Sequence, residues 1–290
     1  MRIAVTGQYG QVAASLADRG SGVEVVLLGR PALDLLDRDR VLTAIRRARP
    51  DAIISAAAYT AVDKAEAEPD LAMRINGDGA GYVAEAAASL GVPLVHLSTD
   101  YVFDGALARP YREDDATGPT GAYGRSKLAG EERVLAACPD SAVLRTAWVY
   151  SPFGANFVRT MLRLGETREE IGVVADQHGN PTSALDIADA LVSIACRLHV
   201  DPTPKLRGVF HMTGGGEATW ADFAEAIFAG AQHHGRNPIR VNRIATADYP
   251  TAAKRPANSR LDNTKLRDAF GISLPDWQDS LSACLDRLLP

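Results

Sequence analysis

Residues 3–13 read IAVTGQYGQVA, a short apolar run that leads directly into a glycine-containing turn and then into a helical pattern. In such a turn glycine supplies a positive φ, and the backbone can approach a diphosphate held at the N-terminus of the following helix. Ala13 stands where a small residue lets that helix pack close to the strand. A motif this short also fits a simple turn, but its place after the first strand predicts dinucleotide binding at Gly7 and Gly10.

Outward from this segment, apolar runs alternate with helical patterns through the first half of the chain. The apolar runs cover 3–6, 23–28, 52–57, 94–98 and 142–147, and the helical patterns cover 11–19, 38–49, 67–90 and 122–137. Continuous apolar runs suit strands that are buried on both faces of a parallel sheet. The alternation therefore predicts an α/β protein whose residues 1–150 form a doubly wound parallel sheet, a Rossmann domain that binds the dinucleotide.

After about residue 150 the pattern changes. Helices are predicted over 156–165, 183–198, 220–234, 263–270 and 276–289, and a strand is predicted over 209–212. No internal repeat and no long linker separates the two halves. We expect residues 151–290 to form a smaller, mainly helical lobe that binds substrate, and interleaving of this lobe with the first domain stays open.

Composition excludes several classes of protein. The 290 residues carry 31 Lys+Arg against 36 Asp+Glu, a net charge of −5 without a basic run, so no nucleic-acid partner is expected. No apolar stretch is long enough to span a membrane, and the first residues lack the pattern of a signal peptide. The three cysteines show neither a disulfide framework nor a metal-ligand spacing. We expect a cytoplasmic protein without a membrane or metal partner.

A tyrosine and a lysine four residues apart are the first candidates for catalysis. Tyr123 and Lys127 lie in the predicted helix 122–137, where this spacing places both side chains on one face. The chain has 26 Arg and only five Lys, so a lysine in this position is informative. We expect the ammonium to stabilise the phenolate and lower the tyrosine pKa, so that Tyr123 exchanges a proton with a carbonyl oxygen during hydride transfer. The alternative is an exposed pair on a helix surface.

A hydroxyl at a strand end completes the set. Ser98-Thr99-Asp100 ends the fourth apolar run, at the edge where open α/β sheets bind ligands. The Thr99 hydroxyl can polarise the reacting carbonyl, although a hydroxyl in this position is commonly a cap. The glycine turn, the strand-end hydroxyl and Tyr-x-x-x-Lys follow one another in the chain order of the short-chain dehydrogenases/reductases.

The residue after the second strand bears on the choice of cofactor. An acidic residue there holds the 2′-hydroxyl of NAD, whereas Arg suits the 2′-phosphate of NADP. The chain reads Leu28-Gly29-Arg30 at this point. This favours NADPH, with Arg30 on the phosphate; if Arg30 is a solvated loop cation, NADH stays open.

Longer motifs make the likeness more specific. The chain resembles the dTDP-4-dehydrorhamnose reductases, a family of extended short-chain dehydrogenases/reductases, over nearly its whole length. The resemblance is carried by TGQYGQV (6–12), LDLLD (33–37), RPD (49–51), SAAAYTAVDKAE (55–66), Asn76, HLSTDYVFDG (96–105), YGRSKLAGE (123–131), RTAWVY (145–150), NFVRTMLRL (156–164) and RPANSRL (255–261).

The resemblance implies roles for individual residues. Thr99, Tyr123 and Lys127 take the catalytic roles, and Tyr123 and Lys127 also contact the cofactor. The other implied cofactor contacts are Gly10, Gln11 and Val12 at the diphosphate, Asp34 and Leu35 at the adenine, and Ala56, Ala57 and Ala58 at the end of the third strand. Substrate contacts are implied for Thr99, Tyr123, Asp100, Trp148 and Asn156. Asp100 as a cap and Trp148 as a core residue are the alternatives.

The implied reaction is NAD(P)H-dependent reduction of the C4 ketone of dTDP-4-dehydro-β-L-rhamnose to dTDP-β-L-rhamnose. Another nucleotide-sugar reductase or epimerase of the superfamily, or a non-catalytic nucleotide-binding regulatory subunit, is the alternative. Some members of the family are dimers with Mg²⁺ at an acidic interface in the first helix, but this chain has Ser15 there. No metal is therefore expected, and the choice between monomer and homodimer stays open.

Overall fold

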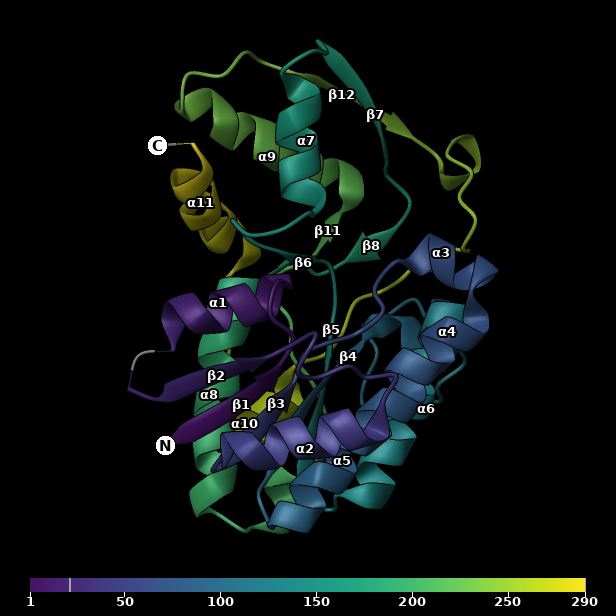
Figure 1. Ribbon diagram of the computed structural model, residues 1–290. Helices are drawn as coiled ribbons and strands as arrows, with labels where there is room; N and C mark the ends of the chain where they lie inside the picture. The colour runs from purple at the N-terminus through teal and green to yellow at the C-terminus, as the bar shows by residue number, and fades with distance from the viewer. Residues whose placement is uncertain (21, 290) are drawn as a thin grey trace.

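The computed structural model describes residues 1–20 and 22–289 and shows a larger lobe beneath a smaller one (Figure 1). The larger lobe is built on a parallel sheet in the order β10-β5-β4-β3-β1-β2. Its strands are β1 (Arg2–Thr6), β2 (Glu24–Leu28), β3 (Ala52–Ser55), β4 (Leu94–Thr99), β5 (Ser141–Thr146) and β10 (Gly208–His211). The doubly wound fold expected from the sequence is confirmed. Strand order reverses at β1, so the carboxyl ends of β1 and β3 form the edge where such sheets bind ligands.

Alternate strand residues build one core on each face of this sheet. Ile3 and Val5 of β1 point toward α1 (Gln11–Arg19), α8 (Ala184–Val200) and α10 (Thr264–Phe270). Ala4, between them, points to the opposite face, which is covered by α2 (Arg38–Ala48), α5 (Gly79–Leu90) and α6 (Ala122–Ala137). The strands are therefore apolar throughout because both of their faces are buried.

The prediction of one continuous helix over 67–90 is wrong. The chain forms α3 (Val62–Ala67), α4 (Pro69–Met73), the π-helical turn η1 (Arg74–Asp78) and then α5. Pro69 has no backbone N–H, so it ends one helix and begins the next. The wider turn of η1 holds Asn76, which is buried and reaches Ser126 of α6.

The smaller lobe contains more strand than the sequence predicted. Its helices α7 (Phe157–Gly165), α9 (Trp220–His233) and α11 (Trp277–Leu288) pack with a parallel pair, β7 (Glu170–Val174) and β12 (Arg240–Ile244). Short strands β6 (Val149–Tyr150), β8 (His178–Gly179), β9 (Thr182–Ser183) and β11 (Ala218–Thr219) join the lobes, and 3₁₀ turns lie at η2 (Asp100–Val102), η3 (Pro204–Leu206) and η4 (Thr246–Asp248). Strands β7 and β12 escape prediction because each is short and mixes charged with apolar residues.

The chain passes repeatedly between the two lobes. It enters the smaller lobe after β5, returns at α8 and β10, leaves again for α9 and β12, and returns once more at α10. Strand β10 pairs with β5, and α8 packs on α1, so both belong in space to the sheet lobe. Within residues 1–20 and 22–289, no helix combines the length and apolar character needed to cross a membrane.

Candidate active site

The glycine turn forms an open cradle at the start of α1. Gly7 has φ +104°, a backbone conformation that favours glycine, and a Cβ there would lie in ordinary contact with the Cβ of Ala57, at 3.6 Å. Gly10 is the N-cap of α1, and a Cβ added to it would meet nothing within 4 Å. Among residues 1–20 and 22–289 no side chain caps α1, so the N–H groups of Gln11 and Val12 can meet a ligand. This geometry fits the diphosphate of a dinucleotide.

The end of β3 is pinned beside this cradle. The Thr6 hydroxyl, buried on β1, accepts hydrogen bonds from the backbone N–H groups of Ala56 and Ala57, each at 3.1 Å. The small side chains of Ala56, Ala57 and Ala58 are partly exposed at this edge of the sheet. Their expected position along the cofactor stays a prediction.

Asn76 connects that segment to α6, the helix of Tyr123 and Lys127. Its Oδ1 accepts a hydrogen bond from the Tyr59 N–H at 2.7 Å, and its Nδ2 donates to Tyr59 O at 3.0 Å. The same Nδ2 donates to Ser126 Oγ at 2.9 Å, and Ser126 Oγ donates to Tyr123 O at 2.8 Å. The loop after β3 and the first turn of α6 are thus fixed to each other.

Arg30 and Asp34 face each other across the loop after β2. Arg30 Nε lies 3.1 Å from Asp34 Oδ2, and two-thirds of the Arg30 side chain is exposed. Asp34 Oδ1 accepts the N–H of Leu36 at 3.1 Å, and Leu35 is buried against Gly79. The loop therefore offers an acid and an exposed guanidinium, and further N–H donors of Arg30 can meet a phosphate.

The predicted catalytic residues gather at the carboxyl end of β4. Thr99 is the last residue of that strand, and Tyr123 and Lys127 lie in the first two turns of α6. The Thr99 side chain lies beside the Tyr123 phenol. The ring of Tyr101 meets that of Tyr123 edge to face, with centroids 5.5 Å apart.

The acidity of Tyr123 differs from the sequence-based expectation. Burial raises the Tyr123 pKa far above its usual value, and the charge on Asp100 adds to this, whereas the neighbouring Thr99 side chain opposes it. The expectation that Lys127 lowers the Tyr123 pKa is wrong for this arrangement, because the ammonium is bonded to Leu97 O instead. A phenol that holds its proton firmly is suited to donate it only when negative charge develops on a nearby oxygen.

Lys127 is almost completely buried, with 3% of the residue exposed. Its Nζ donates to Leu97 O at 2.7 Å and lies 3.5 Å from His96 Nε2. Burial lowers the Lys127 pKa to about 8, and the charge of Glu131 opposes this shift. The side chain therefore lies along β4, beneath the place where a nicotinamide ribose would meet it.

Asp100, the next residue after Thr99, has a buried acceptor atom without a partner among the described residues. The residue is 4% exposed, and burial raises its pKa to about 6. The Thr99 hydroxyl donates to Asp100 Oδ1 at 2.9 Å, whereas Oδ2 has no hydrogen-bond partner among the described residues. A buried acceptor without a partner is unfavourable, so it invites a donor such as a sugar hydroxyl.

Trp148 forms an aromatic wall in the smaller lobe. Its indole stacks on Trp220, with centroids 3.6 Å apart and planes within 9°. A Cβ on Gly179 would lie 2.3 Å from Trp148 Cε2, and Trp148 itself has φ +48°, unusual for a bulky residue. The side chain is half-buried and packs against the core of the smaller lobe. Its contact with the substrate stays a prediction.

Asn156 is engaged within the protein. Its Oδ1 caps α7 by accepting the Arg159 N–H at 3.2 Å. Its Nδ2 donates to Gln11 Oε1 at 3.0 Å and to Ser151 O at 2.8 Å, which links the first turn of α1 to the smaller lobe. Its contact with the substrate diphosphate remains a prediction.

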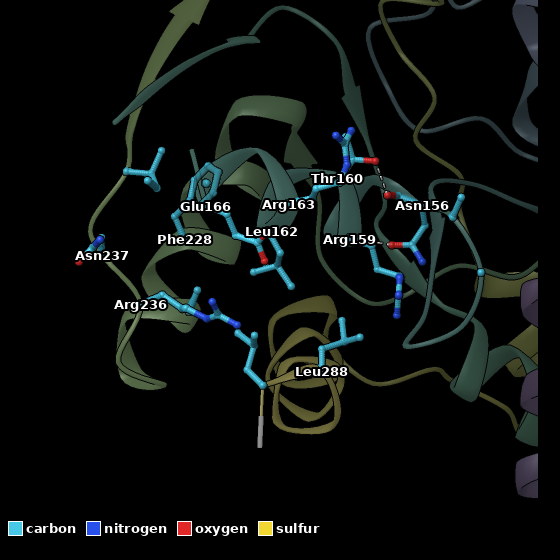
Figure 2. A pocket seen from close by; sticks show the side chains of 16 residues that line it. Asn156, Arg159, Thr160, Leu162, Arg163, Glu166, Phe228, Arg236, Asn237 and Leu288 are labelled. Atoms are coloured by element: carbon cyan, nitrogen blue, oxygen red, sulfur yellow. Dashed lines mark hydrogen bonds between the residues drawn. The ribbon is translucent and has the colours of Figure 1, made fainter. Parts of the chain in front are cut away.

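A cavity of about 770 Å³ opens between α7, α9 and α11 (Figure 2). Asn156, Arg159, Leu162, Phe228 and Arg236 are among its lining residues, which do not include the expected catalytic groups. It is therefore separate from the site at the end of β4.

Sequence reasoning assigned no individual role to Glu131 and Arg145. With Ser98, they form a buried charged cluster beneath α6. Arg255 bonds the Tyr101 hydroxyl at 3.2 Å and pairs with Asp63, so it fastens the C-terminal segment to α3. Glu131 follows Lys127 by four residues, and that spacing is the one signal that could have found it.

The sheet edge thus joins a dinucleotide cradle to the half-buried phenol of Tyr123, an arrangement that fits a nicotinamide-dependent oxidoreductase of the short-chain dehydrogenase/reductase type. Residues 1–289 match the family described as RmlD substrate binding domain. The chain belongs to this family, that of the dTDP-4-dehydrorhamnose reductases, and the resemblance found in its motifs is confirmed.

Individual relatives match over nearly the full length. The dTDP-4-dehydrorhamnose reductase of Sinorhizobium fredii is 54% identical over 281 residues, covering 97% of this chain and 95% of the relative. A solved dTDP-4-dehydrorhamnose reductase from Clostridium acetobutylicum has a TM-score of 0.91 at 38% identity, with 99% of each chain covered. The enzyme from Bacillus anthracis, solved in complex with NADP, has a TM-score of 0.91 at 35% identity and 98% coverage of each chain.

Proposed function

We propose that the protein reduces the C4 ketone of dTDP-4-dehydro-β-L-rhamnose to the alcohol of dTDP-β-L-rhamnose, with NADPH as the hydride donor. The observation that carries the proposal is the meeting of Thr99, Tyr123 and Lys127 at the end of β4, next to an open dinucleotide cradle. The substrate is inferred from the relatives, which are dTDP-4-dehydrorhamnose reductases.

Each catalytic residue has a separate task. The reduced nicotinamide supplies a hydride to the carbonyl carbon. As negative charge develops on the carbonyl oxygen, Tyr123 donates its phenolic proton, so the O–H bond of the tyrosine breaks and that of the product forms. Thr99 holds the same oxygen beside Tyr123, and Lys127 holds the nicotinamide ribose. A proton from water then restores the phenol.

The remaining residues bind the sugar nucleotide. Trp148 offers a flat face to the hexose ring, and the Oδ2 atom of Asp100 accepts a hydrogen bond from a sugar hydroxyl. Asn156, at the start of α7, is proposed to approach the diphosphate, after exchange of its bond to Gln11.

NADPH is the proposed cofactor. NADP is bound by the Bacillus anthracis relative, and the exposed Arg30 of this chain has further guanidinium N–H donors that can bind a 2′-phosphate. Asp34 beside it is the acid that would serve the 2′-hydroxyl of NADH, so both cofactors are to be titrated. The reaction is placed in the cytoplasm, where the three free cysteines of the described chain stay reduced.

The test is NADPH oxidation with enzymatically prepared dTDP-4-dehydrorhamnose, followed by identification of the product sugar. The proposal expects stoichiometric NADPH consumption and dTDP-L-rhamnose as product. A 4-epimeric sugar would assign the protein to a related reductase. An exchange of substrate isomers without net NADPH loss would indicate an epimerase, and tight NADP binding without turnover would indicate a regulatory protein.

A further inference from the structure

A buried ion pair lies next to the catalytic residues of α6. Glu131 is 2% exposed and Arg145 is 4% exposed. The Arg145 guanidinium donates from Nε to Glu131 Oε1 at 2.9 Å and from Nη2 to Oε2 at 2.7 Å. Ser98 Oγ donates a further hydrogen bond to Oε1 at 2.5 Å. The carboxylate is therefore held from two strands at once.

The three residues lie where they can control the catalytic geometry. Glu131 follows Lys127 by four residues and Tyr123 by eight, so all three share a face of α6. Ser98 immediately precedes Thr99, and it stands opposite Arg145 in the register of β4 and β5. The cluster thus fastens the catalytic helix to the strand end that carries the Thr99 hydroxyl.

Stability alone does not account for this pair. Removing two charges from water is costly, and an apolar pair of the same volume commonly serves a fold equally well. Arg145 Nη1 has no hydrogen-bond partner among the described residues, although the guanidinium lies 5.0 Å above the ring of Phe103. A functional reason is therefore to be sought in a neighbour, and the other buried charged side chain of α6 is Lys127.

Glu131 is the negatively charged group that acts on Lys127. From β4, Leu97 O accepts a hydrogen bond from the ammonium, and His96 adds no charge because burial lowers its pKa well below 6.5. On α6, the negative charge of Glu131 favours the ammonium form of Lys127. On β5, the charged group is Arg145, which has the opposite sign and is paired with Glu131. Tyr123, one turn earlier, keeps its proton and is neutral.

We propose that Glu131 is a positioning residue of the reductase: it keeps Lys127 an ammonium and holds α6 in register with the end of β4. Without this carboxylate, Lys127 loses its proton at a lower pH and holds the cofactor ribose more weakly, and Tyr123 is less well fixed beside Thr99. The catalytic part of this inference rests on the proposed function, whereas the part that concerns cofactor binding does not.

The experiment compares Glu131→Gln with Glu132→Gln, its exposed neighbour on the same helix. NADPH affinity is measured by fluorescence across neutral and alkaline pH, and kcat and KM for the sugar nucleotide are measured over the same range. For Glu131→Gln, we expect the alkaline loss of NADPH affinity and of kcat to move about one pH unit lower. At neutral pH we expect kcat to fall roughly tenfold, since a small misplacement of catalytic groups is costly. Glu132→Gln should match the wild type throughout.

A second pair of variants separates this role from simple stability. Glu131→Gln leaves Arg145 buried without its partner, so its melting temperature should fall. Glu131→Gln combined with Arg145→Gln removes that charge: the melting temperature should recover, while the alkaline limb stays displaced. Glu131→Asp retains the carboxylate and should retain most of the wild-type pH dependence.

Three results would overturn the inference. These are an unchanged pH dependence in Glu131→Gln, an alkaline limb that returns together with the melting temperature in the double variant, and displacement in Glu131→Asp equal to that in Glu131→Gln. If Glu131→Gln does not fold, the pH dependences of the double variant and of Glu131→Asp still separate positioning from stability. If the wild type fails to reduce the sugar, the proposed function fails, yet the pH dependence of NADPH binding still decides the role of Glu131.

Discussion

The two walls of the proposed site use different forces. The sheet lobe contributes charged and ionisable groups that are buried and held by hydrogen bonds, such as Lys127, Asp100 and Glu131. The smaller lobe contributes stacked rings, of which Trp148 on Trp220 is the clearest pair. Electrostatic groups in a low dielectric act strongly on developing charge, whereas aromatic surfaces act mainly through contact area. Substitutions in the first wall should therefore change kcat, pH dependence or stability, and those in the second should change KM.

The largest effect is expected for Tyr123→Phe. The ring and its edge-to-face contact with Tyr101 are retained, but the proton donor is lost. We expect kcat to fall on the order of a thousandfold while NADPH affinity stays near that of the wild type. Tyr249→Phe, at an exposed tyrosine, is the control. Steady-state kinetics checks this, and near-wild-type turnover would assign the proton donor elsewhere.

Lys127→Met should stabilise the protein while it impairs cofactor binding. The pKa of Lys127 is lowered from 10.5 to about 8 by burial, so the folded state disfavours the ammonium at neutral pH. The corresponding cost is about 3 kcal/mol, which the methionine does not incur. Between about pH 8 and pH 10.5 the unfolded chain binds more protons, so wild-type stability should rise with pH in that window. Urea denaturation at several pH values tests this, and a less stable variant at neutral pH contradicts it.

Trp148→Ala should act on substrate binding more than on turnover. Loss of the stacked face is expected to raise KM for the sugar nucleotide about tenfold, with a smaller change in kcat. Trp148→Phe, which keeps an aromatic face, should recover part of the affinity. An unchanged KM in the alanine variant would make Trp148 a core residue, the alternative left open by the sequence.

The smallest effect is expected from the ionisation of Asp100. Burial raises its pKa from 3.8 to about 6, so the carboxylate gains a proton as pH falls through about 6. Loss of this acceptor should raise KM several-fold below that pH. In the window between 3.8 and 6 the folded state binds more protons, so the free energy of unfolding should fall as pH rises. Asp100→Asn should abolish both dependences, and their persistence would assign them to another group.

The sequence predicted the sheet lobe better than the smaller lobe. Strands such as β1 and β4 are continuous apolar runs, because helices cover both sheet faces. In contrast, β7 and β12 pair over a long separation, and their mixed composition carries no clear period. The π-helical turn at 74–78 could not be predicted either, since nothing local distinguishes it from α-helix.

For the site, local spacing was informative and long-range contacts were not. The four-residue interval between Tyr123 and Lys127 predicted their shared helix face. The direction of Lys127 depends on Leu97 O, and the bonds of Glu131 reach Ser98 and Arg145, which are 33 and 14 residues away. Such partners are fixed only by strand register.

The repeated passage of the chain between the lobes limits how such an enzyme can be modified. Cutting after residue 150 would remove β10 from the edge of the sheet and α8 from one of its faces, leaving apolar strand and helix surface in water. Exchanging the sugar-binding lobe for that of a relative therefore needs several matched splice points rather than one. New substrate specificity in this scaffold is more accessible through point substitutions around Trp148 than through recombination of whole modules.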